Sequence, residues 1–149
     1  MAWVALGANL GDPRATLVRA RRWLGAIPGT RVVASSRIHL TAPVGPPQPP
    51  YLNAVVRLVT DLPPRALLDA LHRLEAAAGR VRGVRWGPRT LDLDLLLYAA
   101  RVSADPALTL PHPRLHERRF VLAPLCDIDP TLSHPVLART MEELLRACR

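Results

Sequence analysis

The sequence predicts an α+β fold in which one domain, residues 1–149, folds around a mainly antiparallel sheet covered on one face by helices. Two observations predict it. Short aliphatic stretches of strand length alternate with two longer stretches whose apolar residues recur at helical spacing. Clusters of Gly and Pro separate these stretches and mark the turns. At 149 residues the chain is long enough to bury a sizeable core as a single domain.

In the first half of the chain, residues 3–6 form the first strand candidate. Asp12 followed by Pro13 is typical of a helix start, because Asp caps the first turn and Pro fits within it. This helix is expected to run to about Gly25. The second strand is expected at residues 31–36, with a possible extension to residue 40. The proline-rich residues 41–50 cannot join a sheet interior and are expected to form a stiff surface loop.

In the second half, residues 52–61 form the third strand candidate. A second helix is expected after Asp61, with Leu67 and Leu71 on its apolar face and an end at Gly79. The fourth strand covers residues 91–98. The resulting order β-α-β-β-α-β is the ferredoxin-like pattern. A C-terminal extension follows, with a short strand near residues 107–110 and short helices at about 117–125 and 140–149.

The segment 80–94 holds the strongest candidate for a functional site. Asp92 and Asp94 would lie on one face of the fourth strand, because residues i and i+2 of a strand point the same way. Two close carboxylates favour a cation between them, and Mg²⁺ commonly takes one or two carboxylates plus substrate phosphates. Four arginines precede the pair, and guanidinium groups bind phosphate oxygens in pairs; they are Arg80, Arg82, Arg85 and Arg89.

Each part of this segment also has an ordinary structural explanation. An alternating Leu-Asp run is typical of any half-exposed strand, and a run of arginines is usually a solvated face. The combination of the Asp pair, the arginines and Trp86 in one short segment favours a site for a metal-bound polyphosphate.

Composition narrows the class of protein. The formal charge of +8 comes with no lysine at all, which excludes the phosphate loop and the protein-kinase site that depend on a Lys ammonium. Excess positive charge suits an anionic partner, either nucleic acid or a small polyphosphate. No apolar run long enough to span a membrane and no signal-peptide pattern is present. With two cysteines that form no metal or disulfide framework, a cytoplasmic protein is expected.

Five stretches together resemble one enzyme family. They are Ala5-Leu-Gly-Ala-Asn-Leu-Gly11, Tyr51-Leu-Asn53, Gly79-Arg-Val-Arg82, Arg85-Trp-Gly-Pro-Arg-Thr-Leu-Asp-Leu-Asp94 and Pro111-His-Pro-Arg-Leu-His-Glu-Arg118. The sequence is similar to the 6-hydroxymethyl-7,8-dihydropterin pyrophosphokinases. The resemblance implies transfer of the pyrophosphoryl group of ATP to the hydroxymethyl group of the pterin in folate biosynthesis, with release of AMP. It also implies a monomer whose partners are these two substrates, with no nucleic acid and no membrane.

The resemblance also implies roles for individual residues. Two Mg²⁺ ions that accompany ATP would be held by Asp92 and Asp94, and the catalytic set would be these two residues with Arg82, Arg85 and Arg89. The expected ATP-binding residues are His72, Glu75, Arg82, Trp86, Arg89, His112 and Arg118. The expected pterin-binding residues are Thr41, Ala42, Val44, Tyr51, Asn53, Trp86 and Phe120. The loops 43–50 and 80–89 are expected to close over bound substrates.

Phosphoryl transfer depends mainly on positioning and charge neutralisation, so no dedicated general base is expected. His112 is the one nearby candidate that titrates near neutrality. Three alternatives stay open: a ferredoxin-like RNA-binding module, a nucleotide or metabolite sensor without turnover, and a kinase that transfers only the γ-phosphoryl group. The acidic pair on the binding face argues against RNA, and release of ADP instead of AMP would identify the ordinary kinase.

Overall fold

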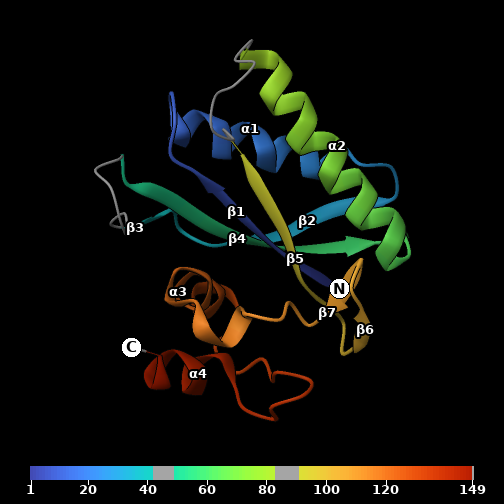
Figure 1. Cartoon of the computed structure of the whole chain (residues 1–149), viewed down its shortest axis with the longest axis vertical. Helices are drawn as coiled ribbons and strands as arrows, with labels where there is room; N and C mark the ends of the chain where they lie inside the picture. Colours follow the sequence, from blue (N-terminus) through green and yellow to red (C-terminus); the bar gives the residue numbers. More distant parts are fainter. Residues whose placement is uncertain (42–48, 83–90, 149) are drawn as a thin grey trace.

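A five-stranded antiparallel sheet forms the centre of the molecule (Figure 1). The computed structural model describes residues 1–41, 49–82 and 91–148, and for residues 80–82 the backbone alone. The strand order is β2-β4-β1-β5, and the short β3 also pairs with β4. The expected second strand is therefore divided, with β2 and β3 following each other along β4. The strands are β1 (Ala2–Ala8), β2 (Thr30–Ser35), β3 (His39–Thr41), β4 (Tyr51–Thr60) and β5 (Asp92–Tyr98).

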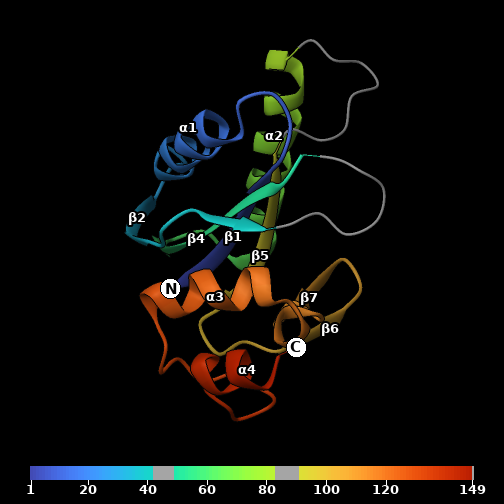
Figure 2. The same cartoon turned by 90° about the vertical axis from the view of Figure 1, so that its left-hand side faces the viewer.

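Two helices cover one face of this sheet, α1 (Pro13–Gly25) and α2 (Pro64–Arg82), and Figure 2 shows both on the same side. The predicted start of α1 is confirmed, since the Asp12 carboxylate accepts a hydrogen bond from the Ala15 N–H at 3.1 Å. The predicted end of α2 at Gly79 is wrong. The helix continues to Arg82 because Gly79 does not adopt a positive φ, and therefore does not make the left-handed turn that ends many helices.

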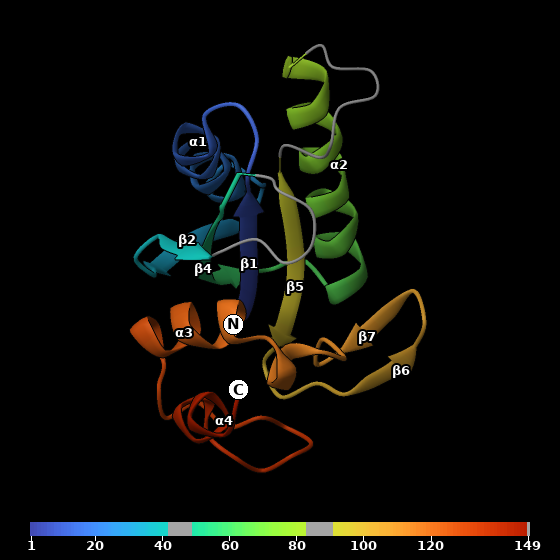
Figure 3. The same cartoon turned by 60° about the vertical axis from the view of Figure 1, so that its left-hand side comes forward.

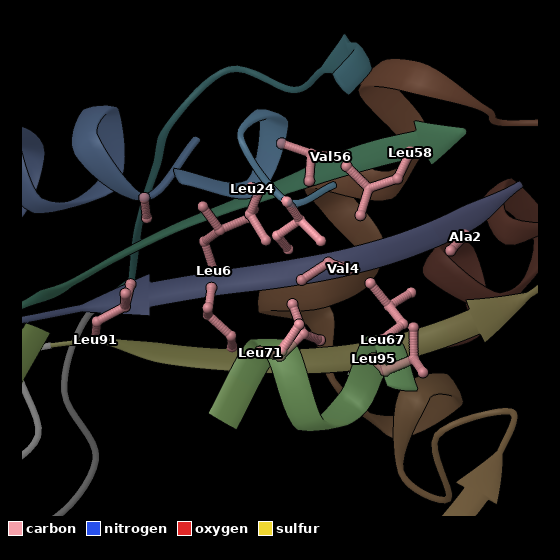
Figure 4. Packing of buried hydrophobic residues seen from close by; sticks show 14 of the residues in the cluster. Ala2, Val4, Leu6, Leu24, Val56, Leu58, Leu67, Leu71, Leu91 and Leu95 are labelled. Atoms are coloured by element: carbon pink, nitrogen blue, oxygen red, sulfur yellow. The ribbon is translucent and has the colours of Figure 1, made fainter. Parts of the chain in front are cut away.

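Aliphatic side chains fill the layer between these helices and the sheet (Figure 4). Val4 and Leu6 of β1 point toward Leu24 of α1 and Leu71 of α2. The predicted apolar face of this strand is confirmed, because Leu93 and Leu95 of β5 and Leu91 just before it belong to this same core and are at most 6% exposed.

The other face of the sheet is also apolar, and a C-terminal layer covers it (Figure 3). The predicted extension thus adds a third layer, where the ferredoxin-like pattern alone leaves this face open. Trp3 of β1 packs there among residues of the last two helices, such as Leu122 and Met141. The layer contains a short 3₁₀ turn η1 (Leu115–Glu117), α3 (Arg119–Ile128) and α4 (Met141–Ala147), and a small hairpin precedes it, β6 (Ser103–Asp105) with β7 (Leu108–Leu110).

One carboxylate anchors this layer to the sheet. Asp129, which follows the last residue of α3, accepts hydrogen bonds from the Trp3 indole N–H and from the Arg57 guanidinium, each at 2.7 Å.

None of the helices in the described ranges is long and apolar enough to cross a membrane.

A β-bulge in β5 decides which of its residues face the C-terminal layer. Val4 of β1 pairs with Leu95 and Trp3 pairs with Leu97, so Leu96 is the extra residue. Before the bulge the strand alternates strictly, with Leu93 and Leu95 buried under α1 and α2. Asp92 and Asp94 therefore point to the opposite face, as predicted, near the end of the sheet.

Candidate active site

A pocket of about 660 Å³ opens on the face of the sheet that carries the C-terminal layer. It lies where the end of β1 meets the beginnings of β4 and β5, since Gly7 pairs with both Asn53 and Asp92. Most of the predicted site residues that the structure describes line this pocket. They are Thr41, Tyr51, Asn53, Glu75, Asp92, Asp94, His112, Arg118 and Phe120.

The two aspartates form one flank of the pocket. Asp94 is about half exposed, and one of its oxygens lies 4.0 Å from a guanidinium nitrogen of Arg118. Between the aspartates, the backbone N–H of Leu93 donates to the Glu75 carboxylate at 2.9 Å. Because β5 is the last strand in the sheet order, this N–H has no strand beside it, and Glu75 of α2 supplies the missing acceptor. Glu75 thus fixes the strand segment that presents both aspartates.

His112 adjoins the acidic flank and is held in one tautomer. Its backbone N–H donates to the Leu96 carbonyl at 2.8 Å, and its ring Nδ1 accepts from the Arg114 N–H at 3.2 Å. Burial lowers the pKa of His112, and the charges of Arg118 and Arg114 lower it further against the opposing effect of Asp94. The imidazole is therefore neutral at pH 7 with its proton on Nε2, where it can donate a hydrogen bond into the pocket.

The opposite flank combines an amide and aromatic rings. The side-chain amide of Asn53, which is 7% exposed, donates from Nδ2 to the Thr41 hydroxyl at 2.8 Å. Phe120, at the start of α3, is 38% exposed, and the Arg118 guanidinium lies 5.6 Å from its ring centroid. Tyr51 completes this flank. A flat polar ligand would find both a stacking surface and in-plane hydrogen-bonding groups here.

A second carboxylate fixes the strand that carries Thr41. Asp127 of α3 accepts hydrogen bonds from the Arg37 backbone and guanidinium, and lies 2.7 Å from the His39 ring Nε2. Partial burial tends to raise the pKa of Asp127, but these hydrogen bonds outweigh it and hold the pKa below its usual range. The C-terminal layer thus positions β3, and with it the Asn53 side of the pocket.

His72 lies in an adjoining pocket of about 240 Å³. This smaller pocket runs between α2 and the β6-β7 hairpin, and its wall includes Leu68 and Leu108. Asp94 and His112 line both pockets, so the two pockets adjoin at these side chains.

Some of the predicted site residues lie outside the part of the chain that the structure describes. They are Ala42, Val44, Arg85, Trp86 and Arg89, and most of the two expected lid loops falls there too. Arg82 is described by its backbone alone, in the last turn of α2. Gly7, Arg114 and Glu117 are among the pocket residues that received no role from the sequence. The last two form an ion pair at 3.3 Å, which their i,i+3 spacing within the stretch 111–118 signals.

On one flank of this pocket lie paired carboxylates, an arginine and a neutral histidine, and on the other an amide and aromatic rings. This arrangement on a ferredoxin-like core suits a phosphotransferase with a flat acceptor. Residues 3–130 match the family model described as 7,8-dihydro-6-hydroxymethylpterin-pyrophosphokinase (HPPK). The chain belongs to this family, as its resemblance predicted. It is a pyrophosphokinase that acts on hydroxymethyldihydropterin in folate synthesis.

Individual relatives agree with this assignment. The 2-amino-4-hydroxy-6-hydroxymethyldihydropteridine pyrophosphokinase of Pseudomonas aeruginosa is 46% identical over 147 residues, covering 98% of this chain and 90% of the relative. The protein of the same name from Bacillus subtilis is 43% identical over 129 residues, covering 86% of this chain and 77% of the relative.

Solved structures support the fold. A structure of HPPK-DHPS in complex with substrates has a TM-score of 0.73 at 13% identity, and a Plasmodium falciparum HPPK-DHPS structure has 0.75 at 12%. Each comparison covers 98% of this chain but less than half of the solved chain, 44% and 45% respectively. The ferredoxin-like architecture predicted from the sequence is thus confirmed.

Proposed function

We propose that the pyrophosphoryl transfer takes place in the pocket of about 660 Å³, with ATP phosphates beside Asp92 and Asp94 and the pterin against Asn53 and Phe120. The observation that carries this proposal is that both flanks belong to one pocket. The hydroxymethyl oxygen would attack the β-phosphorus of ATP and lose its proton to solvent, the bond between that phosphorus and the α-phosphate oxygen would break, and AMP would leave.

Mg²⁺ is the metal that suits the acidic flank. Among the described residues no group of three or more His, Cys, Asp or Glu side chains could hold a metal by itself. Two carboxylates on one face of β5 do fit Mg²⁺, which takes one or two carboxylates and completes its shell with phosphate oxygens and water. We infer that Asp92 and Asp94 hold two Mg²⁺ ions together with ATP. The metal would neutralise phosphate charge and orient the reacting oxygens.

The adjoining pocket of about 240 Å³ suits the nucleoside of ATP. Its aliphatic wall, with Leu68 and Leu108, offers an apolar surface to a base, and His72 adds a polar group beside it. From there a triphosphate reaches the larger pocket past Asp94 and His112, which line both. Glu75 would act chiefly by holding the backbone of β5 in place.

The remaining polar groups would position and neutralise the phosphates. Arg118 lies beside Asp94 and is suited to bind a phosphate oxygen once the metal engages the carboxylate. Neutral His112 would donate from Nε2 without adding a full charge. The roles assigned to Arg82, Arg85 and Arg89 stay predictions from the sequence. Positioning of two reactants in one pocket is itself a large part of catalysis for a transfer of this kind.

On the acceptor side, the Asn53 amide would bind the polar edge of the pterin while Phe120 and Tyr51 contact its faces. Thr41 orients the amide through its hydroxyl. We further propose that the chain acts as a single domain and a monomer in the cytoplasm, with these two small molecules as partners and neither nucleic acid nor membrane.

A product analysis tests the proposal. The protein is incubated with ATP, Mg²⁺ and the dihydropterin, and AMP and ADP are separated by chromatography. Pterin-dependent AMP that is lost in Asp92→Ala, and kept in Asp69→Ala, is the expected result. Asp69 is a suitable control because its carboxylate pairs with Arg65 on the exposed side of α2. ADP as the product, or AMP formation that survives Asp92→Ala, would contradict the proposal.

A further inference from the structure

Gly7 occupies the middle of the pocket floor. It pairs with Asn53 of β4 on one side and with Asp92 of β5 on the other. Side chains of residues directly opposite each other in an antiparallel sheet lie on the same face. Asn53, Gly7 and Asp92 therefore form a row across three strands, with the acceptor flank at one end, the metal flank at the other and no side chain between them.

The close approach of Asn53 explains why residue 7 has no side chain. A Cβ atom at Gly7 would lie 3.2 Å from Oδ1 of Asn53, tighter than nine in ten real Cβ contacts. The backbone does not require glycine at this position, since the described glycines with positive φ are Gly11 and Gly29. Glycine also weakens a strand interior relative to alanine. Its presence here is therefore explained by the space it leaves beside Asn53.

That space fixes the direction of the Asn53 amide. Nδ2 donates to Thr41, so Oδ1 is turned toward β1 and Gly7. In the described ranges the side chain of Asn53 makes this hydrogen bond to Thr41, and the residue, which lines the pocket, is 7% exposed. An amide oxygen at the wall of a pocket can accept a hydrogen bond from a ligand. The amino and ring N–H groups at the edge of a pterin are donors of the right kind and lie in one plane.

We propose that Gly7 is a positioning residue for acceptor binding, because it lets the Asn53 amide point Oδ1 across β1 toward the N–H edge of the bound pterin. The inference rests on the proposed location of the pterin in this pocket. A methyl group at position 7 would displace the amide by a few tenths of an ångström and misalign this hydrogen bond. The affinity for ATP, which would bind on the Asp94 side, would not change.

The test compares Gly7→Ala, Asn53→Ala and the double variant with the unmodified protein. Gly25→Ala is the matched control, because its Cβ would meet only Val32 at an ordinary 3.8 Å on the opposite face of the sheet. Pterin affinity is measured by calorimetry in the presence of Mg²⁺ and a non-hydrolysable ATP analogue, and the affinity of the analogue is measured separately. Urea unfolding shows whether each variant is folded.

Gly7→Ala is expected to weaken pterin binding by about 10-fold or more, the usual effect of one misplaced methyl group in a binding pocket, and to leave the analogue's affinity and the urea midpoint unchanged. The double variant is expected to bind no more weakly than Asn53→Ala, because the methyl group acts through the amide. Unchanged pterin affinity in Gly7→Ala, equal weakening of both ligands, or additive losses would each overturn the inference. If Asn53→Ala also bound pterin normally, the proposed location of the pterin would be wrong as well.

Discussion

Asp94→Asn separates a functional carboxylate from a structural one. The substitution keeps the shape of the side chain and removes its charge. If Asp94 serves to hold Mg²⁺ with ATP, then turnover depends on that charge and the fold does not. The magnitudes of the effects on stability and on turnover follow from the structure.

The effect on stability is the balance of two opposing interactions. Asp92 and Asp94 are two residues apart along a strand, about 6.6 Å, so their repulsion is about 0.6 kcal/mol in bulk water and about 2.5 kcal/mol at an effective dielectric constant of 20. Against this, Arg118 lies 4.0 Å from Asp94 with both side chains partly exposed, and such pairs contribute about 0 to 1 kcal/mol net. The free energy of unfolding should therefore fall by less than about 1 kcal/mol, or it should rise.

The effect on turnover is far larger. A metal ion at a phosphoryl centre supplies several kcal/mol of transition-state stabilisation, and a loss of about 4 kcal/mol corresponds to a rate reduction of about 1,000-fold. The assay combines initial rates of AMP formation over a range of Mg²⁺ concentrations with urea unfolding followed by circular dichroism. Asp69→Asn removes the same charge from an exposed pair on α2 and should alter neither quantity. A variant of Asp94 that keeps its rate within 10-fold, or that unfolds, would refute this reasoning.

Three further predictions concern stability and are measured by urea unfolding. Asp129→Asn should lower the free energy of unfolding by about 2 to 3 kcal/mol, because the amide keeps one neutral acceptor oxygen and turns an N–H group toward the other donor, either the Trp3 indole or the Arg57 guanidinium; a change below 0.5 kcal/mol, within the range of ordinary surface substitutions, would contradict the anchoring role. His134 is buried, and its Nδ1 accepts hydrogen bonds from two backbone N–H groups. Burial lowers the pKa of His134, and the nearby His116 lowers it further. The unfolded chain therefore binds more protons below about pH 6.5, so stability should fall as pH drops from 7.5 to 5, and less steeply in His134→Gln. Gly79→Ala should stabilise α2 by roughly 0.5 to 1 kcal/mol, because alanine has the higher helix propensity and its Cβ would meet open space. A loss of stability would contradict this prediction.

The sequence predicted those elements whose signals are local. The Asp12-Pro13 start of α1 depends on neighbouring residues, and the structure reproduces it. The same holds for the alternation that places Asp92 and Asp94 on the face opposite Leu93. Local periodicity is enough in these cases, because neither feature depends on residues far along the chain.

The features that the sequence did not predict depend on distant partners. The bulge at Leu96 arises from the pairing of β5 with Trp3 and Val4, about ninety residues away, and nothing within β5 signals it. The C-terminal layer covers the sheet because the second face is apolar, which becomes visible only once the strands are placed side by side. Arg114 and Glu117 enter the pocket for the same reason, since their segment lies beside β5 through the hydrogen bond from His112 to Leu96.

The order of the strands has a consequence for synthesis on the ribosome. β1 is the middle of the site's floor, yet β4 and β5, its two neighbours, follow about 50 and 90 residues later in the chain. Until β5 has emerged, at least one edge of this apolar strand has no partner, and such edges favour aggregation. The nascent chain therefore carries an exposed strand edge through most of its translation.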